Sequence, residues 1–419
     1  MVHRTPREAK AIYRRGDQDM APPWPIEYAY YAFIFYSIAG TALGLSAPLL
    51  GGGILAVLAA FCALRLGSRA IIVYKPILLL FVFAISFLVV QITIHGASIT
   101  DGIIRVFTTW VLGLIIVQSL CLRQGFLHRF MIVLLLIGLT TLPYLEIGAG
   151  DRVIVEPTLA GDFNNPNGLG AWFGFCAVYL AIFGIETKRN AVRIASWLVA
   201  CGCLLIVGLT VSRGALIATV TAIVVASRHL LKRGFLPILV LIVLSWVCYE
   251  SGIFDRAVSR YTGRMTEDSG RASVWPLAVE RALSSPLVGV GNSNIATYVP
   301  WQHQSITPHN TFIYLLLSSG VIPIAFFVTF WIRAARNAFL YTEQQAYSSF
   351  RGPFLVYIFW ITLVGDLGFM VTWGLVVFPI VMTSRPSSLK KSFGVRRIKK
   401  FRTVQHFEPR VARPHIPSS

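Results

Sequence analysis

The chain has 419 residues, of which 55% are hydrophobic and 13% are charged, and its mean hydropathy is +0.67. Soluble domains carry about 25% charged residues, so this composition excludes an ordinary soluble globular protein and indicates an integral membrane protein with many spans. The net charge is +19. Its basic residues cluster beside apolar segments, which favours a signal of membrane topology over a nucleic-acid partner.

Twelve segments are candidates for membrane spans, because a spanning helix needs about 20 apolar residues. Backbone polar groups in lipid must bond within their own segment, so we expect helices and an all-α polytopic fold. In chain order the candidates are 27–45, 48–66, 75–95, 102–121, 129–147, 168–186, 193–211, 214–228, 234–250, 310–332, 352–367 and 368–384.

The basic residues predict an orientation. With the N-terminus inside, 29 of the 37 Lys and Arg fall on one side of the membrane. The positive-inside rule then makes residues 1–26 a cytoplasmic tail, 27–384 the transmembrane domain with an external loop at 251–309, and 385–419 a basic cytoplasmic tail. We expect the basic tail to contact anionic lipids. The basic residues left on the outer side are Arg105, Arg152, Arg213, Arg256, Arg260, Arg264, Arg271 and Arg281.

The external loop is a long polar interruption in an apolar chain. Apolar residues within it recur at helical spacing, which predicts a short amphipathic helix on the outer surface of the membrane domain. Arg271 opens this stretch and Pro286 ends it. The apolar positions are Val274, Trp275, Ala278, Val279 and Ala282.

Two outer positions carry groups suited to chemistry. Arg213 lies in a tight turn between two apolar runs, and His309 follows Pro308 where the next helix is expected to start. The positive end of a helix favours neutral imidazole, which can accept a proton, and it also attracts phosphate. Simpler roles compete with these: His309 as a helix cap, Arg213 as a headgroup anchor, and Arg271 as a solvated loop residue.

Several motifs together form a recognisable pattern. They are Asn165-Pro166-Asn167, Ser212-Arg213-Gly214, Gly270-Arg271 with Trp275, Gly289-Val290-Gly291, and Pro308-His309-Asn310-Thr311-Phe312 followed by Gly320. The pattern resembles the O-antigen ligase and polymerase family of bacterial envelope glycan transferases. That resemblance implies transfer of a glycan from undecaprenyl pyrophosphate to a hydroxyl of lipid A-core or of another lipid-linked glycan. It also implies an inner-membrane protein whose active site faces the periplasm.

The resemblance and the chemistry assign candidate roles to five residues. His309 is the expected base or orienting group for the acceptor hydroxyl. Arg213 and Arg271 are expected to bind pyrophosphate oxygens, because the guanidinium fork binds such groups bidentately. Asn167 and Asn310 are expected as further substrate contacts.

We expect no metal and no other cofactor, since the outer carboxylates show no recognisable metal motif. The competing function is a transporter or flippase of polysaccharide or lipid-linked sugar. Transporters usually carry internal repeats and ionisable residues near the bilayer midplane. Here the charged residues gather at the ends of the apolar segments, which favours an enzyme open to the outer face.

Overall fold

A computed structural model describes residues 23–37, 48–66, 75–121, 123, 125–148, 152–155, 163, 165–230, 250, 255, 259, 271–300, 303–340 and 348–364. This part of the chain is helical apart from two small antiparallel sheets. The all-α membrane fold class is therefore confirmed. The number of twelve spans and the division into a membrane domain and two tails stay predictions, since 1–22, the candidates 234–250 and 368–384 and the tail 385–419 lie outside the described residues.

The helices begin and end close to the apolar segments. They are α2 (Trp24–Phe35), α3 (Pro48–Leu66), α5 (Lys75–Val89) with the π-helical turn η2 (Val90–Ile94), α6 (Gly102–Leu120), α7 (Phe126–Thr140), α8 (Pro166–Glu186), α9 (Asn190–Leu209), α10 (Arg213–Leu230), α13 (Arg271–Leu283), α14 (Thr311–Ser319), α15 (Val321–Leu340) and α16 (Ser348–Val364). Among the described residues, four helical segments are long and apolar enough to cross a membrane: Gly102–Leu120, Phe126–Tyr144, Pro166–Glu186 and Asn190–Leu209.

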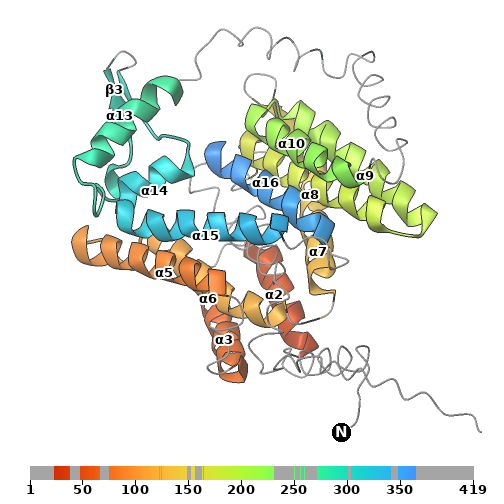
Figure 1. Cartoon of the computed structure of the whole chain (residues 1–419), viewed down its shortest axis with the longest axis horizontal. Coiled ribbons are helices and arrows are strands. Elements are labelled where there is room, and N and C mark those ends of the chain that lie inside the picture. Colours follow the sequence, from red (N-terminus) through yellow and green to blue (C-terminus); the bar gives the residue numbers. More distant parts are fainter. Residues whose placement is uncertain are drawn as a thin grey trace, which may run out of the picture. The chain divides into compact units, whose positions relative to one another are not determined.

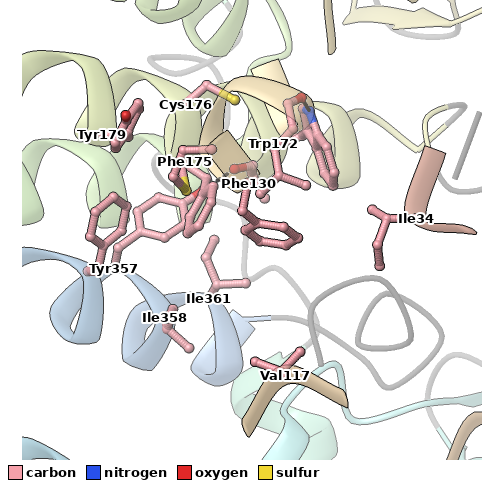
Figure 2. Close-up of a cluster of buried hydrophobic side chains, with 14 of the residues drawn as sticks. Ile34, Val117, Phe130, Trp172, Phe175, Cys176, Tyr179, Tyr357, Ile358 and Ile361 are labelled. Atoms are coloured by element: carbon pink, nitrogen blue, oxygen red, sulfur yellow. Dashed lines mark hydrogen bonds between the residues drawn. The ribbon is translucent and has the colours of Figure 1, made fainter. Parts of the chain in front are cut away.

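Helix α8 is the most enclosed of these four segments. Its residues are apolar on every side, as expected of a helix that neighbouring helices surround. Helices α9 and α10 pack along it (Figure 1). A Cβ at Gly174 would lie 2.3 Å from the hydroxyl oxygen of Thr219, so this glycine allows α10 to approach. Phe175 of α8 packs against Phe354 and Tyr357 of α16, in a core that Figure 2 shows in part.

An ion-pair cluster joins α2 to the start of α7 and to the connection between α6 and α7. The Glu27 carboxylate is fully buried and lies 2.7 Å from Nε of Arg129 and 3.3 Å from Nε of Arg123. Both guanidinium groups stack over the ring of Trp24, and Tyr31 donates a hydrogen bond to Glu27 at 2.5 Å. All these segments are predicted to lie on the cytoplasmic side. Their contact is compatible with that topology, which stays a prediction.

The predicted span 310–332 is wrong as a single helix. The structure divides it into α14 and α15 at Gly320, whose φ of +77° ends α14. The turn that contains Leu287 passes so close that a Cβ at position 320 would lie 2.3 Å from the Leu287 carbonyl oxygen. The amide of Val321 then donates to the Pro286 carbonyl at 2.8 Å. The apolar pattern continues through this break, and a contact from another segment imposes it.

The predicted span 129–147 is also wrong at its end. Helix α7 stops at Thr140, and the chain continues through the 3-10 turn η3 (Leu142–Tyr144) into strand β1 (Leu145–Gly148). Pro143 has no amide hydrogen to continue the helical pattern. Strand β1 instead pairs with β2 (Arg152–Val155). The first predicted span, 27–45, is described only in its first part: α2 begins at Trp24, and residues 38–45 lie outside the described residues.

The external loop contains the predicted short helix. In α13, Val274, Ala278 and Ala282 are buried, while Val279 is 36% exposed. The buried alanines pack on Leu317 of α14, and α13, β3 and α14 lie together in Figure 1. The loop also holds the 3-10 turn η5 (Asn292–Asn294) and the paired strands β3 (Thr297–Val299) and β4 (Gln304–Ile306). These pieces were not predicted, because three-residue elements carry no readable periodicity.

Replacing Gly320 by alanine should destabilise the protein. Gly320 has φ +77° and ψ -171°, a conformation essentially restricted to glycine, which costs other residues about 1–3 kcal/mol, and the collision with the Leu287 carbonyl adds to this cost. The matched control is Gly202→Ala in α9, where a Cβ meets nothing within 4 Å. Thermal unfolding in detergent should show a clear loss for Gly320→Ala and no loss for Gly202→Ala. Equal stability of the two variants would contradict the described junction.

Candidate functional site

The N-termini of α8 and α10 lie side by side. A Cβ at Gly170 would lie 2.6 Å from the hydroxyl oxygen of Thr210 and 3.3 Å from Cβ of Ser212, so this glycine lets the turn before α10 pack on the first turns of α8. The Asn165 side chain caps α8 by accepting from the amide of Asn167 at 2.9 Å. Two helix starts thus meet in one corner of the fold.

This corner, which we call the Arg213 corner, contains two of the predicted site residues. Arg213 is the first residue of α10 and Asn167 lies in the first turn of α8, and both side chains are exposed. Val211 adopts a φ of +51°, which turns the chain sharply into α10. Helix N-termini carry partial positive charge and unpaired amide groups, so two of them beside an exposed arginine form an environment that suits an anion.

The start of α14 lies one residue after the start of the predicted span 310–332, although Pro308 favoured a start at His309. The helix begins at Thr311 and not at His309, because Asn310 is its N-cap. The Asn310 side-chain oxygen accepts from the amides of Phe312 and Ile313 at 3.0 and 3.2 Å, and the residue is 5% exposed. Asparagine is among the best N-cap residues, whereas the proline rule concerns the first helical position. The predicted substrate contact by Asn310 stays a prediction beside this structural role.

His309 precedes the cap and is exposed. Its φ of +43° is rare for a residue with a side chain. The indole Nε1 of Trp275 donates to the carbonyl of Pro308, directly before it, at 2.7 Å. Arg271 opens α13 one turn before Trp275, and positions four apart lie on one face of a helix. Positions 271 and 309 are therefore brought to a second corner, the His309 corner, although the Arg271 side chain lies outside the described residues.

Helix α16 separates the two corners. Its Tyr357 hydroxyl donates to the carbonyl of Ala171 in α8, and its Phe359 ring lies 6.3 Å from Phe312 in the first turn of α14. Residues two apart project from nearly opposite sides of a helix. The segments that carry the two corners, represented by Ala171 of α8 and Phe312 of α14, thus contact opposite sides of α16.

A polar network that the sequence analysis missed supports the His309 corner. The Gln91 side chain, 1% exposed in η2, donates to the Ser318 carbonyl at 2.6 Å and accepts from the Asn292 amide at 3.1 Å. Tyr314 donates its hydroxyl to the Asn292 side chain. The sequence feature that could have indicated this network is a glutamine within an apolar segment. Gln91 lies in a π-helical turn, and such turns are frequent at functional sites.

The Gly289-Val290-Gly291 motif joins this network through its backbone. The Val290 amide donates to the Leu317 carbonyl at 2.6 Å, and a Cβ at Gly289 would lie 2.3 Å from the same oxygen. Gly291 packs on the ring of His95, whose Nε2 bonds the Val288 carbonyl at 2.9 Å. The motif therefore serves close packing against the C-terminal end of α14.

Among the residues that the structure describes, no group of three or more His, Cys, Asp or Glu side chains could share a metal ion. The expectation of metal-independent chemistry stays a prediction.

Comparison with known families places the site in context. Residues 167–328 match the family model described as O-antigen ligase. The match contains all five predicted site residues, and it confirms the resemblance stated from the motifs. A search of curated proteins found no match.

Substitution of Asn310 should separate capping from substrate binding. Asn310→Ala removes the acceptor for two amides and should cost about 1 kcal/mol of stability, whereas Asn310→Asp retains the cap. Asn165→Ala at the cap of α8 gives the matched comparison. If Asn310 only caps α14, Asn310→Asp should keep both thermal stability and glycan transfer. Loss of transfer in a stable Asn310→Asp variant would instead assign Asn310 to the substrate.

Proposed function

Given the match of residues 167–328 to the O-antigen ligase family, we propose that the protein transfers a glycan from undecaprenyl pyrophosphate to a hydroxyl acceptor. The reaction takes place at the outer face of the bacterial inner membrane, with the site open to the periplasm. The observation that carries the proposal is that this match contains the whole set of candidate residues. Glycan transfer of the ligase or polymerase type, with lipid-linked glycans as substrates, follows from the family.

The leaving group in this reaction is a lipid pyrophosphate, and the Arg213 corner suits it. Arg213 is exposed and offers a planar set of donors to phosphate oxygens. The adjoining N-termini of α8 and α10 add partial positive charge from the same side. Arg271 is the second phosphate ligand in this proposal, acting from the His309 corner.

His309 is the group that receives the proton. The acceptor hydroxyl attacks the anomeric carbon, a new glycosidic bond forms, and the bond from that carbon to the pyrophosphate oxygen breaks. The hydroxyl proton passes to the imidazole, and the pyrophosphate leaves on its lipid. A direct displacement of this kind inverts the anomeric carbon.

The acceptor distinguishes a ligase from a polymerase. A ligase hands the glycan to lipid A-core, and a polymerase hands it to another lipid-linked repeat unit. Purified protein mixed with lipid-linked donor and each acceptor in turn tests both, and a new glycosidic bond formed in detergent separates an enzyme from a transporter or flippase. No new bond with either acceptor would contradict the proposal.

Substitution of His309 tests the reaction most directly. A positioned base contributes about 10²–10⁴-fold, so His309→Ala should lose at least about 100-fold in transfer rate while the protein remains folded. His309→Gln keeps hydrogen bonding but cannot take up the proton. Activity in the glutamine variant but not in the alanine variant would make His309 an orienting group, and full activity in the alanine variant would refute its role.

Substitution of Arg213 tests whether donor binding needs the planar guanidinium group as well as the positive charge. Arg213→Lys retains the positive charge but cannot bind two phosphate oxygens in one plane, so we expect weaker donor binding with normal expression. Arg333→Ala is the control, since Arg333 is also exposed but lies on the predicted cytoplasmic side. The measured quantity is KM for the lipid-linked donor. A donor KM unchanged in both Arg213→Ala and Arg213→Lys would exclude pyrophosphate binding at this corner.

A further inference from the structure

The backbone of His309 needs support from its neighbours. A φ of +43° is disfavoured for a residue with a Cβ, and such conformations persist where the surrounding structure holds them. On its C-terminal side, His309 is followed by Asn310, which caps α14. The Asn310 carbonyl accepts a hydrogen bond from the Tyr314 amide at 2.8 Å. The other side of His309 is held by Trp275.

The contact with Trp275 fixes a whole peptide plane. Its indole Nε1 donates to the Pro308 carbonyl at 2.7 Å, and the amide of His309 belongs to the same planar unit. Holding the carbonyl oxygen therefore also sets the direction of the His309 N–H and the position of its Cα. Pro308 itself is buried and its φ is restricted by its ring, which leaves this hydrogen bond to set the rotation of the plane.

Trp275 is a fixed reference point because α13 is anchored without its indole. Ala278 and Ala282 are buried against Leu317 of α14. Arg281, further along α13, donates to the Ala296 carbonyl at 2.5 Å. These contacts lie one to two turns beyond Trp275. Loss of the indole N–H would therefore release the Pro308–His309 peptide and leave the helix in place.

We propose that Trp275 is a positioning residue for glycan transfer: its indole N–H holds the Pro308–His309 peptide so that the imidazole meets the acceptor hydroxyl. The inference rests on the proposed function, since it requires His309 to act in the reaction. It assigns the tryptophan of the external loop a role in the turnover step and none in binding the donor.

The test removes the N–H and keeps the ring. In Trp275→Phe, kcat for transfer should fall on the order of 10- to 100-fold, because small misplacements of a reacting group cost about that much. The donor KM and the thermal unfolding temperature in detergent should stay close to those of the wild type. Should the phenylalanine variant fold poorly, benzothienylalanine at position 275 keeps the shape of indole, replaces only the N–H with sulfur, and should show the same loss of kcat.

Two matched control variants carry the same Trp→Phe substitution at other positions in the chain. Trp331→Phe removes an indole N–H that is buried and has no hydrogen-bond partner among the described residues. Trp172→Phe removes one that donates to the Leu134 carbonyl at 3.1 Å in the core. Trp172→Phe should lower stability, and both controls should keep kcat within about twofold. This contrast separates positioning from the general loss of a structural hydrogen bond.

A double substitution shows whether Trp275 acts through His309. In the His309→Gln background, Trp275→Phe should cause no further loss of kcat, because the group that it positions is gone. A multiplied loss, or an unchanged kcat in the single Trp275 variants, would overturn the inference. Full activity in His309→Ala would instead overturn the proposed function itself, so the two failures are distinguishable.

Discussion

The close contact between two backbone segments sets the geometry of the region around α13 and α14. The turn at 286–291 lies directly against the junction of α14 and α15, where the Val290 amide donates to the Leu317 carbonyl at 2.6 Å. Gly289 and Gly320 make this approach feasible, since a Cβ on either would collide with backbone atoms. The contact ends α14 after nine residues. Asn310 caps the other end of α14, and His309 lies directly before that cap.

Buried polar groups fasten this junction to the end of α5. Gln91 satisfies both ends of its side-chain amide, on Ser318 and on Asn292, and His95 bonds the turn itself. A buried polar side chain is costly when unsatisfied, so a fully bonded glutamine is a specific connector and not a chance contact. The external loop is thus attached to the third predicted span through side chains that an apolar pattern does not reveal.

The two corners divide the proposed reaction between them. The Arg213 corner offers positive helix ends and a guanidinium, which suit the leaving pyrophosphate. The His309 corner offers an exposed imidazole on an unusual backbone conformation held from both sides. Helix α16 contacts both corners through Tyr357 and Phe359, so the packing of one helix sets their separation.

The sequence by itself determined the all-α membrane class, the positions of long apolar helices such as α8 and α9, the amphipathic helix α13, and the resemblance to the O-antigen ligase family, because these depend on composition, periodicity and local motifs. Tertiary structure alone decided the break at Gly320 and the placement of the two corners on either side of α16. The physical reason is that these features depend on contacts between distant segments. The bond from Gln91 to Ser318 joins residues 227 positions apart, and no local pattern of hydrophobicity records such a contact.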